Sequence, residues 1–137
     1  MSYAISAALQ ESVFLRLSSD PAISALVGTA IYDAIPSGPL PETYVSLGAE
    51  TVLDRSDQTG TGAEHRLTIS VITDQSGFST AKTLAGAISD SLHDADFGLQ
   101  RGRLVFLKFD RAAAKRAGSA NQRRIDMRFR ARVEDNF

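Results

Sequence analysis

The stretch QRRIDMRFRARVEDNF, residues 122–137, decides how the whole chain is interpreted. Its apolar side chains occupy every second position, and charged side chains fill the places between them. A period of two is the period of a β-strand, whose successive side chains point to opposite faces. We therefore predict a strand with an apolar face, formed by Ile125, Met127, Phe129, Ala131 and Val133, and a cationic face, formed by Arg124, Asp126, Arg128, Arg130 and Arg132.

Other strand patterns precede it. A brief apolar strand is expected at residues 31–32, and longer strands are expected at 43–53 and 66–72, the second of which alternates strictly. The segment RGRLVFLKFDRA, residues 101–112, has apolar side chains on both of its sides. A strand that is apolar on both sides is typical of a sheet centre, so we predict a central strand there.

Three helices are expected. Residues 2–17 repeat apolar side chains at four-residue spacing, and residues 76–97 show a similar apolar stripe. A short helix should begin after Asp20, with Pro21 at its first position, and stop at Gly28. The order of elements predicts an α+β fold, a mainly antiparallel or mixed β-sheet with two main helices packed on one face.

At 137 residues the chain is long enough for one domain, 1–137, with one core. Residues 54–64 and 112–121 are polar and glycine- or alanine-rich, so we predict mobile loops near both ranges. The chain has no cysteine, which removes disulfides and thiolate chemistry and is compatible with a reducing compartment. No stretch has the roughly 20 apolar residues of a membrane span.

Catalytic and metal-binding patterns are weak. His93, Asp94 and Asp96 follow one another too closely at a helix end to form a metal site unaided, and we expect a solvated helix end. The glycines of residues 54–64 lack the lysine of a phosphate-binding loop, and no acid pair is marked among Asp33, Glu42, Glu50 and Asp54. We therefore predict no enzymatic activity and no cofactor.

The cationic strand is the main functional signal. The formal net charge of the chain is −1, so any attraction to nucleic acid must be local. Arg124, Arg128, Arg130 and Arg132 could meet phosphates in a row, but the one aromatic residue of the strand, Phe129, points to the other face. Arginine also forms planar bonds to carboxylates and is enriched at interfaces, so we favour a subunit contact.

Taken together, the segments resemble the tail-terminator (tail-completion) family of long-tailed bacteriophages and phage-derived gene transfer agents. The resemblance covers nearly the whole chain. It is carried by the order and spacing of LSSDPAISALVG (17–28), AIYDAIPSGPLPETYVSLGAE (30–50), HRLTISVIT (65–73), AISDSLHDADF (87–97) and RLVFLKFDRA (103–112) paired with RIDMRFRARVE (124–134). One departure is local: Ile72 and Thr73 stand where such proteins often carry a large aromatic residue.

The resemblance implies a tail-terminator-like fold and a structural protein. It implies a six-fold ring that ends the tail tube, contacts the tail tube protein and the head-tail connector, and lets DNA pass without sequence-specific binding. The protein would be made in the bacterial cytoplasm and incorporated at the head-tail junction. On this reading Arg124, Arg128, Arg130 and Arg132 lie at a subunit contact or the channel, and Asp54, Arg55, Asp57, Gln58 and Thr59 form a loop that docks on a neighbouring ring.

Two alternatives stay open. The first is a small nucleic-acid-binding module that uses the basic C-terminal strand. Salt-dependent DNA binding that is lost when Arg128 and Arg130 become alanine would favour it. The second is a nucleotide-processing or toxin-like enzyme, for which the sequence offers no cluster of polar residues.

Overall fold

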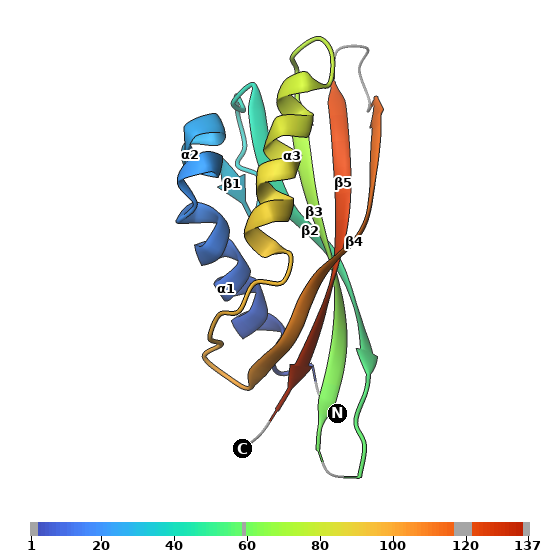
Figure 1. The fold of residues 1–137 in the computed structure, drawn as a ribbon. Coiled ribbons are helices and arrows are strands. Elements are labelled where there is room, and N and C mark those ends of the chain that lie inside the picture. The colour runs from blue at the N-terminus through green and yellow to red at the C-terminus, as the bar shows by residue number, and fades with distance from the viewer. Residues whose placement is uncertain (1–2, 59, 117–121, 136–137) are drawn as a thin grey trace.

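A computed structural model describes residues 3–58, 60–116 and 122–135. The chain forms a five-stranded mixed sheet with three helices on one side of it (Figure 1). The elements in chain order are α1 (Ser6–Ser18), α2 (Pro21–Val27), β1 (Ile31–Tyr32), β2 (Thr43–Asp54), β3 (Gly62–Thr73), α3 (Ser79–Leu92), β4 (Arg103–Arg116) and β5 (Arg123–Glu134). The predicted α+β class is confirmed.

The sheet order is β1-β2-β3-β5-β4. β1 pairs with β2 in parallel, and the three other neighbouring pairs are antiparallel. We call the side that carries the helices the helix face and the other side the open face. The β2–β3 hairpin extends beyond the helices at one end of the sheet, and β4 and β5 reach the opposite end, beside the start of α3 (Figure 1).

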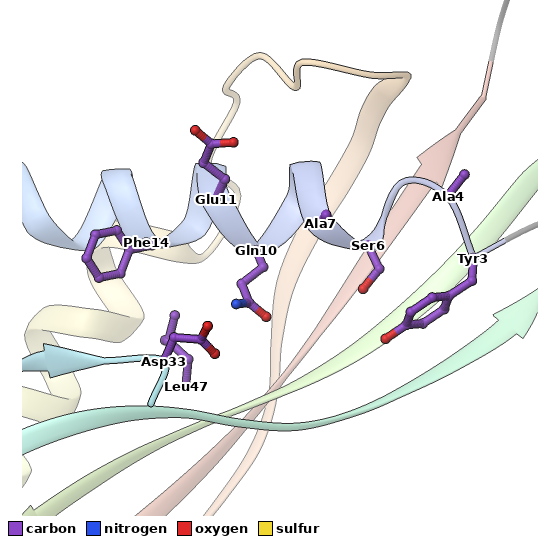
Figure 2. A pocket seen from close by; sticks show the side chains of 9 residues that line it. All are labelled: Tyr3, Ala4, Ser6, Ala7, Gln10, Glu11, Phe14, Asp33 and Leu47. Carbon is purple, nitrogen blue, oxygen red and sulfur yellow. The ribbon is translucent and has the colours of Figure 1, made fainter. Parts of the chain in front are cut away.

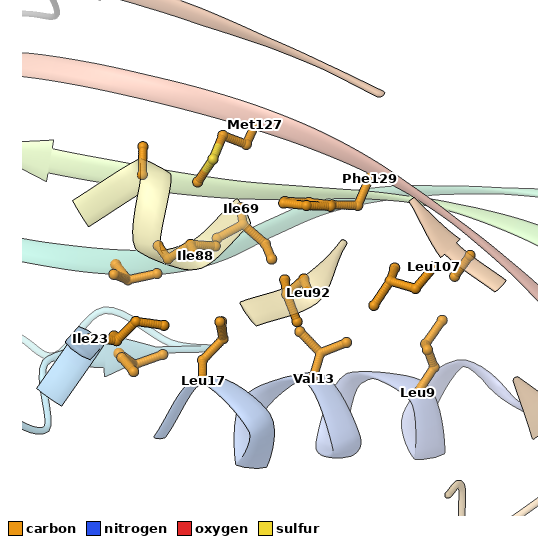
Figure 3. Packing of buried hydrophobic residues seen from close by; sticks show 14 of the residues in the cluster. Leu9, Val13, Leu17, Ile23, Ile69, Ile88, Leu92, Leu107, Met127 and Phe129 are labelled. Carbon is orange, nitrogen blue, oxygen red and sulfur yellow. The ribbon is translucent and has the colours of Figure 1, made fainter. Parts of the chain in front are cut away.

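β5 has the predicted alternation. Its buried positions are Ile125, Met127, Phe129, Ala131 and Val133, and every position between them is partly exposed. The apolar side chains meet α1 and α3 in one core (Figure 3). The α1 stripe of Leu9, Val13 and Leu17 faces Leu92 of α3 and the sheet beyond it (Figure 3). The strand pattern therefore positions the arginines on the open face.

α2 also begins and ends where the sequence predicts. The Asp20 side chain accepts a hydrogen bond from the Ala22 N–H at 2.9 Å, and Pro21 occupies the first helical position. Gly28 ends the helix at a φ of 58°, a region that side chains strongly disfavour. The two longer helices are shorter than predicted, since α1 begins at Ser6 and α3 ends at Leu92.

The prediction of a central strand at 101–112 is wrong, because β4 lies at the edge of the sheet. Only Leu104 and Leu107 are buried, while Val105 and Phe109 are 41% and 39% exposed. Register shifts at Leu104/Phe106 and Phe109/Arg111 break the alternation, as bulges commonly do at sheet edges. The continuous apolar run therefore reflects two bulges and not burial on both sides.

Both predicted loops are shorter than expected. Asp54 ends β2 and residues 62–64 already belong to β3, so the first connection is residues 55–61. Residues 112–116 are the end of β4, which corrects the second range, and 117–121 lie outside the described residues. Polar composition suggested loops at these positions, but backbone pairing within a hairpin does not require apolar side chains. Mobility of either connection stays a prediction.

Candidate assembly surfaces

The open face of the sheet is strongly cationic, because basic side chains of β5 stand beside several basic side chains of β4 and beside Arg66 of β3. The register places Arg111 opposite Arg128, Lys108 opposite Arg130 and Lys115 opposite Arg124. Like charges directly opposite one another destabilise a sheet. Two acids, Glu64 of β3 and Asp126 of β5, partly offset this repulsion.

Glu64 is the centre of one ion-pair network. Its carboxylate accepts bonds from Arg66 Nε at 3.1 Å and Arg130 Nη2 at 3.2 Å, and its side chain is only 7% exposed. Burial alone would raise the pKa of Glu64, but the two guanidinium groups outweigh burial and lower the pKa. Arg130, which we predicted at a subunit contact, is therefore paired with an acid of its own subunit.

Replacing Glu64 by glutamine is expected to lower the free energy of unfolding at neutral pH by about 1–3 kcal/mol, because two arginines lose a charged acceptor. The folded-state pKa lies below the unfolded one, so this contribution is complete above the usual value of 4.5 and is lost as pH falls through the folded pKa. Urea unfolding of both proteins across pH 3–7 measures it. The exposed-acid variant Glu42→Gln should show little difference at any pH; a Glu64→Gln deficit that persists unchanged at pH 3 contradicts the account.

The remaining β5 arginines differ in their surroundings. Arg124 donates to Asp126 at 2.7 Å and to the Ser70 hydroxyl at 3.2 Å. Arg132 donates to the Arg55 carbonyl at 3.0 Å. Within the described part of the chain, Arg128 has no hydrogen bond or ion pair, and it shares a shallow hollow with Arg111 and Thr68. Arg128 is therefore the β5 arginine with most freedom to meet an outside carboxylate.

Hydrogen bonds link several described residues of the connection at residues 55–61. The Asp54 carboxylate accepts from the Ser56 N–H at 3.0 Å and the Ser56 hydroxyl at 2.7 Å, which lowers the pKa of Asp54. Asp57 accepts from the Gly60 N–H at 2.9 Å. Gln58 is exposed at the turn, and Thr59 lies outside the described residues. These contacts fix the Asp54 and Asp57 side chains at the projecting β2–β3 hairpin tip.

The sequence did not indicate the polar cluster that anchors the start of α1. Glu50 accepts from His65 Nδ1 at 2.9 Å, from Ser6 at 2.8 Å and from the Tyr3 hydroxyl. Burial would raise the pKa of Glu50, but bonds from Tyr3, His65 and Ser6 together lower it. Ser6 and His65 both bond the acid and not each other, so the cluster lacks the serine–histidine contact that a nucleophile requires.

The predicted helix-end residues are structural. His93 Nδ1 accepts from the Phe109 N–H at 2.9 Å, and Asp94 pairs with Lys108 at 2.8 Å. These contacts hold the chain after α3 against β4. Among the residues that the structure describes, no group of three potential metal ligands occurs. In the same part of the chain, no helix has the length and apolar character needed to cross a membrane.

A groove lies between α1 and the outer edge of β2, just beyond the point where β1 ends (Figure 2). Its volume is about 520 Å³ and its surface is mostly apolar. Tyr3 and Phe14 mark its two ends along α1, and Leu47 and Asp33 lie opposite the helix (Figure 2). We call this the α1 groove. Because β1 has only two residues, the groove occupies the place that a longer β1 would fill.

Comparison with known proteins identifies the family to which these surfaces belong. Residues 11–134 match the family of the tail completion protein gp17. The chain belongs to this family. It is therefore a structural protein of phage-like tails. A comparison with curated protein sequences gave no match.

A solved structure agrees with the family. A chain in the structure titled "Virion of native gene transfer agent (GTA) particle" is 59% identical in sequence, with a TM-score of 0.93. The match covers 97% of this tail completion protein and 99% of the virion chain. The resemblance inferred from the order of sequence segments is thereby confirmed.

Proposed function

We propose that this protein is the subunit of a six-fold ring that ends the tail tube of a phage-like particle and joins the tail to the head connector. The observation that carries this proposal is a pair of open strand edges on one subunit. β4 forms one edge of the sheet, and β1 covers β2 at only two register positions on the other. Open edges promote association with other chains.

A closed ring accounts for both edges. When one patch of each subunit contacts a different patch of the next, the contact repeats, and a rotation that closes conceals every patch. Membership of the tail completion family and likeness to a chain of a gene transfer agent virion support this arrangement. The partners on the two sides of the ring are then the tail tube protein and a head-tail connector protein.

The site residues take roles within that ring. Arg128, with Arg124, Arg130 and Arg132 around it, contributes first to a subunit contact and second to the channel. A channel through which DNA slides gains nothing from tight phosphate binding, so DNA passes without sequence-specific contacts. The hairpin tip with Asp54, Arg55, Asp57 and Gln58 docks on a neighbouring ring. The protein is made in the bacterial cytoplasm and leaves in the particle.

Electron microscopy of intact particles tests this proposal. We expect six copies of the chain in one ring between the last tube ring and the head connector, and density for the β2–β3 hairpin tip at a ring-to-ring contact. Particles from cells that express a tagged chain provide the control for assignment. A chain found along the whole tube, or in the head shell, would overturn the proposal.

A further inference from the structure

We propose that the end of β4 of one subunit adds as an antiparallel strand to the open edge of β2 of the next subunit and lies in its α1 groove. This inference rests on the proposed ring and names the two surfaces that close it. We call residues 110–116, with the sequence DRAAAKR, the β4 arm. All seven residues of the arm are exposed.

The two edge strands β2 and β4 run in opposite directions. β2, β3, β5 and β4 are neighbours in that order, and each step between them is antiparallel. Three antiparallel steps leave β2 and β4 running in opposite directions. Subunits with the same orientation in a ring therefore bring β4 and the next β2 together as antiparallel strands, the pairing already used by most of the sheet.

Two residues of the β4 arm direct their backbone N–H and C=O groups away from β5. The Phe109 N–H points away from β5, because it donates to His93 Nδ1. In an antiparallel ladder this outward direction recurs at every second partner position of the neighbouring strand. Phe109 faces Phe129 of β5, so the residues facing Met127 and Ile125 also point outward. Those residues of the arm are Ala112 and Ala114.

β2 directs matching backbone groups outward. Val45 directs its N–H outward to the Ala30 carbonyl, at 2.9 Å. The register with β3 carries the same direction across the bulge to Glu50 and Val52. No strand of the described part of the chain lies outside these two residues. β2 thus offers free backbone groups that an antiparallel strand can pair.

The sheet face to which each side chain belongs also agrees with an antiparallel pairing of the β4 arm and β2. Ala112 and Ala114 face core residues of β5 in register, and Val52 faces His65, so all three belong to the helix face. If Ala114 pairs with Glu50 and Ala112 with Val52, the helix face of one subunit continues into the helix face of the next, and the open face continues likewise. Ala114 would then lie at the end of the α1 groove marked by Tyr3 and Ser6, both of which bond Glu50, where a larger side chain would meet the start of the helix, and Ala112 would lie just beyond that end. An alanine run is therefore suited to a strand that lies beneath α1.

Charge supports the same register. Arg116, opposite Arg123, is the cation of the arm that shares the helix face, whereas the α1 groove carries Glu11 and Asp33. With Ala114 beside Glu50, the antiparallel arm continues toward the end of the groove where β1 stops. Arg116 then lies by the two exposed acids of that end. Complementary charges of this kind fix register and suppress wrong partners more than they add affinity.

The absence of cysteine from the chain allows a direct test by cross-linking. The proposed register sets Thr51 of one subunit opposite Ala113 of the next, both exposed and on the open face. Opposite residues of antiparallel strands have Cα atoms about 4.5–5.5 Å apart, within the range of a disulfide. Particles that carry Thr51→Cys together with Ala113→Cys should give, after oxidation, a ladder of linked chains that ends at six.

The controls separate this inference from the ring itself. Thr51→Cys alone, Ala113→Cys alone, and Thr51→Cys with Asp90→Cys on α3 should give no ladder. Rings of six at the junction that fail to cross-link would overturn the edge pairing and leave the ring in place. Junctions without rings of this chain would overturn the proposed function. A link from Thr51→Cys alone to a different particle protein would show that the groove holds that protein instead.

A charge exchange provides a second measurement that does not depend on cysteine geometry. Arg116→Glu and Asp33→Lys should each reduce incorporation of the chain into particles, and the double variant should regain most of it. Both side chains are exposed, so thermal unfolding should be nearly unchanged in all three. A double variant as defective as the single ones, with normal folding, would contradict the contact.

Discussion

Replacing Phe129 by alanine is expected to lower the free energy of unfolding by about 3–5 kcal/mol, the usual cost of removing a buried phenylalanine. Phe129 is fully buried at the centre of β5, where the sheet meets the helices (Figure 3). Its ring also makes an edge-on contact with Phe109, with centroids 5.8 Å apart and planes at 78°. The variant loses apolar burial and this contact together, and the surrounding strands cannot collapse to fill the space.

Phe109→Ala is the matched control, since it removes the other ring of the same pair. Phe109 is 39% exposed at the sheet edge, so we expect a loss of about 1 kcal/mol. Urea unfolding followed by circular dichroism measures both variants. A domain of this size has a stability of about 5–15 kcal/mol, so Phe129→Ala should shift the midpoint strongly. Equal losses in the two variants would mean that the core is not centred on β5.

The β5 strand and α2 could be predicted because their signals are local. Strict alternation has one structural meaning when one sheet face is buried, and an aspartate before proline followed by a glycine stop defines a short helix within its own residues. The burial of Phe129 confirms the predicted strand, and the hydrogen bond from the Ala22 N–H to the Asp20 side chain confirms the predicted start of α2. Information of this kind does not depend on partners that are distant in sequence.

The position of β4 could not be predicted for the opposite reason. Whether LVFLKF lies at a centre or an edge depends on which strand pairs with its outer side, and the sequence of the strand does not contain that information. Bulges between Leu104 and Phe106 and between Phe109 and Arg111 then changed which side chains face the core. The same strand sequence is compatible with an edge position, where Val105 and Phe109 are exposed, and with a central position, where both would be buried.

At the candidate assembly surfaces, too, local features could be predicted from the sequence and long-range contacts could not. The arginines were identified from alternation alone, but their partners were not. Glu64 approaches Arg130 from a strand 66 residues away along the chain, and Glu50 reaches His65 only because a bulge in β2 sets the register. The α1 groove had no sequence signal other than the prolines and polar residues that end β1 early. Long-range register and the premature end of a strand are products of the assembled sheet.

The central claim, that this chain ends the tail, is tested most directly by measuring tail length in particles made without it. If a ring of this protein stops tube growth, deletion of its gene should broaden the length distribution toward overlong tails and leave heads unattached. The tube subunits would retain an exposed end to which further subunits add.

The measurement is negative-stain microscopy of a few hundred tails from deleted and wild-type cells. Expression of the wild-type chain from a plasmid should restore uniform length, while the Phe129→Ala chain, with its expected loss of stability, should restore little. Uniform tails of normal length, joined to heads and delivering DNA in the complete absence of the protein, would contradict the account.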